Sequence, residues 1–212
     1  TPTNDPSLWH LYLQKMLPHQ LLAPIHHNTI HSGEPVFVSG TGVLRYSLFE
    51  GPVTVNDIIA ISPFNDTIHQ LFAESQTKDL PIYGWQLLDW LASANELYAR
   101  AGEYGLATFV LSVLNPQQQQ QQVQDIASAH KSIDPSKVYR IFATDYDAFR
   151  LLSVAMKASG SAFAQGRLYK SQLAYPCESA NDAYLLTELW KEYIRDQMPC
   201  VSQDKPHLRS DV

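Results

Sequence analysis

The segment that best indicates the fold reads SGTGVLRYSLFEGPVTVNDIIAISPFNDT and covers residues 39–67. It follows a short apolar run that predicts a buried strand over 35–39, and it opens with a glycine turn. A single arginine, Arg45, and a Gly-Pro pair come next. Thr54 and Asp57 then match a capping box, with Asp in place of the usual Glu, which predicts the start of a short helix. The segment therefore indicates a strand, a turn and a capped helix that ends before Pro-Phe-Asn-Asp.

The rest of the chain alternates irregularly between predicted helices and strands. No G-x-G-x-x-G motif lies between a strand and a helix, so we expect an α+β fold with a mixed β-sheet flanked by helices. Six consecutive glutamines at 117–122 predict a surface loop. The other predicted elements are helices over 7–22 (interrupted near Pro18), 83–98, 147–159 and 182–198, strands over 67–73, 106–114 and 139–144, and a polar loop over 23–34. Inward faces are predicted at Trp85, Leu88, Leu91 and Leu97 of one helix and at Ala183, Leu186, Trp190 and Tyr193 of another, whose cap is Ser179 to Asp182.

Composition limits the class of protein and of partner. The chain has 212 residues, 45% of them hydrophobic, and a formal net charge of -6. An acidic chain without clusters of Lys and Arg argues against nucleic acid as the partner. No apolar run approaches the ~18 residues needed to span a bilayer, so we expect no membrane span. We expect one domain over 1–212, best supported over 7–150, with a helical C-terminal extension over 160–212.

The beginning of the chain and its two cysteines bear on processing. The first residues, TPTNDPS, contain neither Met nor a signal-peptide pattern, so we expect a processed product or a piece of a longer protein. Cys177 and Cys200 are open to two interpretations, one disulfide or two separate thiols. A glycosylation sequon begins at Asn65, but it falls in the segment where we expect a ligand, and we expect no glycan there.

Metal and nucleophile motifs are absent from the sequence. His26, His27 and His31 share one polar loop, but no H-E-x-x-H, H-x-H, D-x-H or G-N-H motif accompanies them, and we interpret them as incidental. We therefore expect no metal ligand and no catalytic residue in this chain. The pair Asp145 and Asp147 fits either acid–base chemistry or, more commonly, the cap of the helix that follows.

The glycine turn is better suited to ligand binding. Backbone N–H groups in such a turn after a strand are able to cradle an anion. Arg45, three residues past Gly42, is suited to hold a phosphate or carboxylate through its guanidinium fork. The alternatives are a solvated Arg45 and, for Phe64, an ordinary core position.

These motifs resemble the C-terminal domain of the 5'-nucleotidase family. That family has an Asn-Gly-Gly-Gly-Ile-Arg-like turn and, later, a Pro-Phe-Gly-Asn-like segment. A fungal branch of metallophosphatases, with Asn-Thr-Gly-Ser-Ile-Arg, Gly-Pro-Phe-Thr and Val-Ser-Pro-Phe-Thr, is closer still. The resemblance is good over 7–100, weaker to 150 and only compositional beyond. The matching residues are Gly40-Thr41-Gly42-Val43-Leu44-Arg45, Gly51-Pro52-Val53-Thr54 and Ile61-Ser62-Pro63-Phe64-Asn65.

The resemblance implies a substrate site and a missing partner. It places the nucleoside of a nucleotide between the rings of Phe64 and Tyr146, and the anionic part of the substrate at Arg45. The implied substrate-binding residues are Thr41, Gly42, Arg45, Phe64, Asn65, Asp66 and Tyr146. It also implies an N-terminal metallophosphatase domain or chain that holds a divalent metal pair such as zinc or manganese and lies outside this chain, and a secreted or vacuolar location.

Several positions depart from the family pattern and keep a second hypothesis open. Gly40 stands where the family has Asn, Val43 where it has a small residue, and Asp66 where it has a second Asn. Asp147-Ala148-Phe149 replaces the expected Gly-Gly-Asp stretch. The leading hypothesis is the substrate-binding domain of a 5'-nucleotidase-like metallophosphatase that hydrolyses phosphate esters. The alternative is a non-catalytic nucleotide-binding domain or a structural interaction domain.

Overall fold

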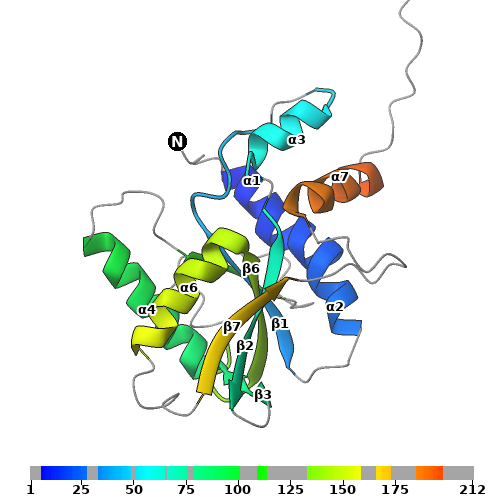
Figure 1. Ribbon diagram of the computed structural model, residues 1–212. Coiled ribbons are helices and arrows are strands. Elements are labelled where there is room, and N and C mark those ends of the chain that lie inside the picture. The colour runs from blue at the N-terminus through cyan, green and yellow to red at the C-terminus, as the bar shows by residue number, and fades with distance from the viewer. Residues whose placement is uncertain are drawn as a thin grey trace, which may run out of the picture.

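The computed structural model describes residues 6–27, 33–48, 51–64, 66–75, 79–100, 109–113, 133–158, 166–172 and 185–197. One mixed sheet forms the centre of the molecule, with helices on both faces (Figure 1). This arrangement confirms the predicted α+β class. The strands are β1 (Glu34–Gly40), β2 (Ile68–Ser75), β3 (Asp79–Leu80), β4 (Ile82–Tyr83), β5 (Phe109–Val113), β6 (Val138–Thr144) and β7 (Gly166–Gln172).

The sheet is mixed because one central pair of strands is parallel. Its order is β3-β2-β6-β1-β5, while β4 also pairs with β6 and β7 with β2. β1 and β6 run parallel, with Val38 opposite Ala143. The pairings of β2 with β6 and of β1 with β5 are antiparallel. The two central strands therefore end at the same edge of the sheet, and this edge carries the residues singled out in the sequence.

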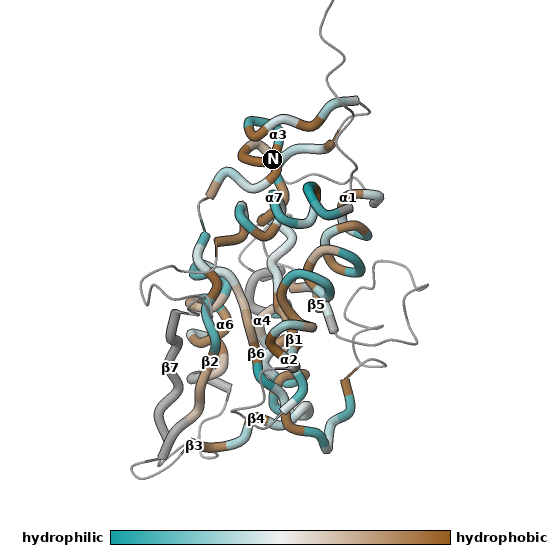
Figure 2. Tube along the Cα trace, turned by 90° about the vertical axis from the view of Figure 1, so that its right-hand side faces the viewer, coloured by the Kyte–Doolittle hydropathy of each residue, from teal (hydrophilic) through white to brown (hydrophobic). Residues whose placement is uncertain are grey.

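Two hydrophobic cores lie on opposite faces of the sheet, because the side chains of each strand alternate between faces. In β1, Phe37 belongs to one core, whereas Val36 and Val38 belong to the other. The first core also takes in the N-terminal helix, α3 (Val55–Ile61) and α7 (Leu186–Gln197). The second takes in α4 (Gly84–Arg100) and α6 (Asp145–Ala158). Figure 2 shows apolar residues recurring along the strands and helices that line these cores.

The N-terminal helix is longer than its sequence predicts. α1 (Pro6–Leu11), a π-helical segment η1 (Tyr12–Leu22) and α2 (Ala23–His27) follow one another directly. The predicted interruption at Pro18 is therefore wrong, because η1 runs through this residue. The predicted polar loop is also wrong over 23–27, where the chain is helical. A π-helix pairs each N–H with the carbonyl five residues earlier, and Ala23 N–H bonds to Pro18 O. The wider turn accommodates the proline ring, and buried apolar residues of η1 hold the segment against the sheet.

The other helices follow their predicted patterns with one correction. Trp85 is 51% exposed, so its predicted inward orientation is wrong. It lies in the first turn of α4, and the inward face is made by Leu87, Leu88, Trp90 and Leu91. In α7, Leu186, Trp190 and Tyr193 are buried as predicted. Several predictions lie outside the described residues: those for Asn65, the glutamine run, Cys177, Cys200, the side chain of Leu97, Ala183 and the cap from Ser179 to Asp182.

Candidate functional site

Three segments distant in sequence meet at the carboxyl ends of β1 and β6. β1 leads into a turn at Gly40, and β6 leads into α6 at Thr144. The segment that precedes β2 reaches the same edge, where Asp145 N–H donates to Thr67 O at 2.9 Å. The turn, the Pro-Phe segment and the start of α6 therefore form one site.

The glycine turn is held by bonds within the protein. Val43 N–H donates to Gly40 O at 3.1 Å, and Gly40 N–H donates to the Oδ2 of Asp147 at 2.8 Å. The side chain of Val43 is buried in the first core, whereas Thr41 and Gly42 are half-buried at the apex. These two N–H groups are thus occupied, which limits the backbone anion cradle expected from the sequence to the apex itself.

Arg45 and Phe64 lie together although helix α3 separates them in sequence. Arg45 N–H donates to Ile61 O at 2.7 Å, which ties the turn to the end of α3. The Cζ of Arg45 lies 5.0 Å from the centroid of the Phe64 ring, within the range of a cation–π contact. The Arg45 Nε is buried and meets no hydrogen-bond acceptor among the residues that the structure describes.

The accessibility of these two side chains bears on the two other interpretations left open by the sequence, a core position for Phe64 and a solvated Arg45. Phe64 is 47% exposed, so its interpretation as a core residue is wrong. Arg45 is half-buried and contacts a ring, so it is more than a solvated surface arginine.

Tyr146 presents a second ring from the first turn of α6. It is 59% exposed, and the Cζ of Arg150 lies 5.3 Å from its ring centroid. Arg150 also lies 5.1 Å from the ring of Phe109. Phe149 is a third exposed aromatic at this end of α6, 62% exposed. Phe149 follows Tyr146 by three residues, and on a helix this spacing places two side chains on the same face. The prediction from the sequence did not use this spacing.

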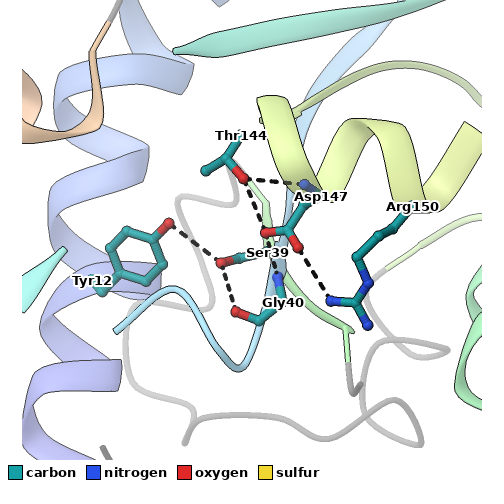
Figure 3. A network of polar contacts seen from close by, with 6 residues as sticks. All are labelled: Tyr12, Ser39, Gly40, Thr144, Asp147 and Arg150. Atoms are coloured by element: carbon teal, nitrogen blue, oxygen red, sulfur yellow. Dashed lines mark hydrogen bonds and ion pairs between the residues drawn. The ribbon is translucent and has the colours of Figure 1, made fainter. Parts of the chain in front are cut away.

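A buried carboxylate lies behind the turn (Figure 3). Asp147 is 3% exposed, and its Oδ1 pairs with Arg150 Nη1 at 3.6 Å. Thr144 Oγ1 donates to Asp147 Oδ2 at 3.2 Å and accepts Asp147 N–H at 3.3 Å, so Thr144 caps α6 and the cap predicted for the Asp145 and Asp147 side chains is wrong. Burial raises the pKa of Asp147, while the Gly40 N–H, Arg150 and Thr144 oppose that shift. Sequence reasoning missed both Arg150 and the link from Asp147 to Gly40.

Asp66 adds a second carboxylate to the same region. Its N–H donates to Phe64 O at 2.6 Å, and its carbonyl accepts Leu186 N–H at 3.0 Å. Burial, followed by the charges of Asp147 and Asp145, raises the pKa of Asp66 to about 6. This carboxyl is therefore mostly ionised at neutral pH and mostly protonated at pH 5.

His69 lies beside one of the acidic side chains of the site. His69 Nε2 lies 2.9 Å from Asp145 Oδ1 and 2.9 Å from Thr67 Oγ1. The His69 side chain is 12% exposed and that of Asp145 52%. His69 thus lies within hydrogen-bond distance of Asp145, and Arg150 places a positive charge against Asp147.

The described part of the chain contains no group of three His, Cys, Asp or Glu side chains placed to hold a metal ion. The converging carboxylates do not form one: Asp147 is engaged by Gly40 and Arg150, and Asp145 by His69. The side chains of His26 and His27, and His31 as a whole, lie outside the described residues. Nor does any described helix have the length and apolarity to cross a membrane.

The structure brings most of the predicted substrate-binding residues to one edge of the sheet. Thr41 and Gly42 form the apex of the turn, Arg45 contacts Phe64, and Asp66 lies close enough to Asp145 and Asp147 for their charges to raise its pKa. Tyr146 begins α6 at the end of β6. The remaining predicted residue, Asn65, lies outside the described residues.

Comparison with known proteins gives one family match. Residues 20–150 match the model of the 5'-nucleotidase, C-terminal domain, and this range includes every predicted site residue. No curated protein sequence matches the chain significantly.

Two solved structures are similar to this chain. A 5'-nucleotidase precursor from Thermus thermophilus shares 14% identity at a TM-score of 0.49, over 87% of this chain and 32% of its own. NAD nucleotidase from Haemophilus influenzae shares 16% identity at a TM-score of 0.47, over 84% of this chain and 29% of its own. The chain thus spans about a third of the length of these proteins.

Proposed function

We propose, on the premise that this chain belongs to the 5'-nucleotidase C-terminal domain family, that it binds the substrate of a 5'-nucleotidase-type metallophosphatase. The reaction is the hydrolysis of a phosphate ester, and the substrate is a nucleotide. The residues of this chain bind and orient that substrate, while the chemistry of bond cleavage is supplied by a metal-bearing domain outside the chain.

The observation that carries this proposal is the pair of exposed rings at one edge of the sheet. Phe64 and Tyr146 are 47% and 59% exposed, and each has a guanidinium within about 5 Å of its ring centroid, as measured for Arg45 and Arg150. Large exposed aromatics tied to cations in this way suit a flat base that carries an anionic group. Exposure alone does not distinguish these rings, since Trp85 is also exposed; the guanidinium beside each ring does.

The other site residues have roles that their positions support. The Arg45 guanidinium, which keeps a buried Nε without an acceptor among described residues, is suited to a phosphate oxygen. Thr41 and Gly42 line the apex of the turn, where small side chains leave room for a ligand. Asn65 and Asp66 follow Phe64, and we assign them to the ribose side, away from the phosphate that a carboxylate repels.

The proposal extends to the parts of the enzyme outside this chain. We infer a partner domain or chain, N-terminal in the family, that holds two divalent metal ions such as zinc or manganese and polarises the phosphate ester. We infer a secreted or vacuolar location from the resemblance to the family. Within this chain we infer a single substrate-binding domain over 1–212, with the residues after 160 as an extension of it.

One observation favours the alternative, a non-catalytic nucleotide-binding domain or a structural interaction domain. Asp66, Asp145 and Asp147 surround the start of α6, and their mutual repulsion contributes to the raised pKa of Asp66. Carboxylates at this density weaken the binding of a dianionic phosphate at neutral pH. Phosphatase activity of the enzyme isolated from its native source would remove this alternative.

The test of binding is a calorimetric titration of adenosine 5'-monophosphate (AMP) into the full chain. Phe64→Ala and Tyr146→Ala are each expected to weaken binding about tenfold, since one stacked base contributes ~1–3 kcal/mol. The matched control is Trp85→Ala, because Trp85 is a comparably exposed aromatic. It lies at the opposite end of β6, where its backbone N–H donates to Pro135 O. Equal effects of all three variants, or no binding of AMP by the unaltered chain, would contradict the proposal.

A further inference from the structure

The two halves of the proposed site depend on one buried side chain. The turn and Tyr146 come from segments about a hundred residues apart, and the Asp147 carboxylate contacts the turn directly and Arg150, which lies against the Tyr146 ring. Its Oδ2 accepts Gly40 N–H at 2.8 Å, and its Oδ1 pairs with Arg150 Nη1 at 3.6 Å. Asp147 is 3% exposed, so it does not itself reach a ligand at the surface.

The absence of a side chain at Gly40 leaves room for the Asp147 carboxylate. A Cβ placed on Gly40 would lie 2.5 Å from Asp147 Oδ1 and 3.2 Å from Arg150 Nη1. The first distance is shorter than van der Waals contact, so any side chain at Gly40 displaces the carboxylate. The space beside the turn is thus filled by Asp147, and a side chain at Gly40 requires this carboxylate to move.

Arg150 carries the link from Asp147 to the exposed ring. Its side chain is 5% exposed, and its guanidinium lies 5.3 Å from the ring centroid of Tyr146 and 5.1 Å from that of Phe109. Phe109 stands opposite Gly40 in the pairing of β5 with β1. The guanidinium is therefore held by a carboxylate and by a strand residue, and it supports Tyr146 from within the protein.

We propose that Asp147 is a positioning residue of the substrate site, which fixes the Gly40–Val43 turn directly and the Tyr146 ring through Arg150. This inference rests on the proposed function, because the turn and the ring are the groups that meet the substrate. It differs from a plain helix cap. The cap of α6 uses the backbone N–H of Asp147, which Thr144 Oγ1 accepts, whereas positioning uses the carboxylate through its contacts with Gly40 and Arg150.

Two substitutions separate these roles. Asp147→Asn retains an oxygen for Gly40 N–H but removes the charge that faces Arg150, so the turn is expected to stay ordered while Tyr146 loses its fixed setting. Asp147→Ala removes both contacts, so the turn and the ring are both expected to loosen. The matched control is Ser112→Ala, which removes another buried hydrogen bond, from Ser112 Oγ to Leu13 O at 2.6 Å, without touching the site.

The experiment compares these variants of the full chain by nuclear magnetic resonance, without ligand and then with AMP. In Asp147→Ala, amide exchange at Val43 is expected to rise about tenfold and the Tyr146 ring signals to shift. In Asp147→Asn only the ring signals are expected to shift. Both variants are expected to bind AMP about tenfold more weakly, whereas Ser112→Ala binds it as the unaltered chain does.

The readouts keep this inference separate from the proposed function. If the unaltered chain does not bind AMP, the proposed function fails, while exchange at Val43 and the Tyr146 signals still decide whether Asp147 orders the turn and the ring. If Asp147→Ala matches Ser112→Ala in both ligand-free readouts, the positioning role is overturned. If the Asp147→Ala chain does not fold, Asp147→Asn, which preserves volume, decides through the Tyr146 signals.

Discussion

The guanidinium carbon of Arg45 lies 5.0 Å from the centroid of the Phe64 ring, although a capped helix stands between the two residues in the chain. The helix closes this distance because its last residue, Ile61, accepts the backbone N–H of Arg45 at 2.7 Å. The cation and the ring are therefore set by the backbone and not by a flexible surface contact.

Arg45→Lys is expected to weaken AMP binding about tenfold, and Arg45→Ala more. A lysine keeps the charge but lacks the planar fork that binds two phosphate oxygens and stacks on a ring. Calorimetric titration of the full chain measures both effects. The control is Arg195→Ala, since Arg195 is 70% exposed and pairs with its neighbour Asp196 on α7. An unchanged affinity in Arg45→Ala would remove Arg45 from the site.

Asp66→Asn is expected to stabilise the protein at pH 7. The pKa of Asp66 is raised to about 6 in the folded chain, above the ordinary value for aspartate, so the folded state holds more protons than the unfolded state between about pH 4 and 6. The stability due to this group is therefore present below pH 4 and is lost as pH rises to 6 and beyond. After allowance for solvent screening of this half-exposed carboxyl, the gain from Asp66→Asn is about 1 kcal/mol.

Thermal unfolding at pH 4 and pH 7 measures this difference, because the variant and the unaltered chain should converge at the lower pH. AMP affinity should differ between the two chains at pH 7, where Asp66 is charged, and be equal at pH 4, where it is protonated. The comparison between the two chains cancels the titration of the phosphate itself. A constant difference at both pH values would show that Asp66 does not titrate in this range.

Thr54→Ala is expected to lower both stability and AMP affinity. Thr54 Oγ1 accepts Asp57 N–H, and Thr54 N–H donates to Asp57 Oδ2 at 2.7 Å, which completes the capping box of α3. Loss of such a cap costs about 1 kcal/mol. Since α3 holds Arg45 through Ile61, fraying of the helix loosens that contact as well. Urea unfolding and AMP titration measure the two effects, and a loss of stability with no loss of affinity would separate α3 from the site.

Gly84→Ala is expected to destabilise the chain by about 2 kcal/mol or more without changing the AMP affinity of the folded fraction. A Cβ at Gly84 would collide with the backbone of Asp134, and overpacking of this kind costs about 1–3 kcal/mol. Gly51→Ala serves as the comparison, because its φ of +133° brings strain but nothing lies within 4 Å. Urea unfolding should rank Gly84→Ala as the more damaging; the reverse order would contradict the close approach to Asp134.

The sequence predicted those parts of the fold that local interactions determine. The capping box of Thr54 and Asp57 lies within four residues and formed as expected. The strand that ends at Gly40 and the amphipathic faces of α7 also follow from short periodic patterns. The end of the first helix did not, because Pro18 usually breaks a helix, and the π-helical turn of η1 and its packing against the sheet have no local sequence pattern.

The candidate site also contains residues that the sequence predicted and residues that it did not. Arg45 and Phe64 stood out because both flank one recognisable segment. Asp147 and Arg150 did not stand out as parts of the site, because their contact with Gly40 depends on the parallel register of β1 and β6 and on the direction of α6. A residue 107 positions away in sequence leaves no local pattern. The position of Tyr146 was inferred from the resemblance, and its exposure became visible only in the fold.

The most direct test of the central claim is a heteronuclear resonance titration of the full chain with AMP, in which each backbone amide reports its own change. Shifts are expected to concentrate in residues 40–46, 63–67 and 144–150, at the carboxyl ends of β1 and β6. Residues 83–86 and 133–137, at the opposite end of β6, should remain unchanged. Shifts confined to that opposite end, or none at saturating AMP, would contradict the assignment of this chain as a nucleotide-binding domain.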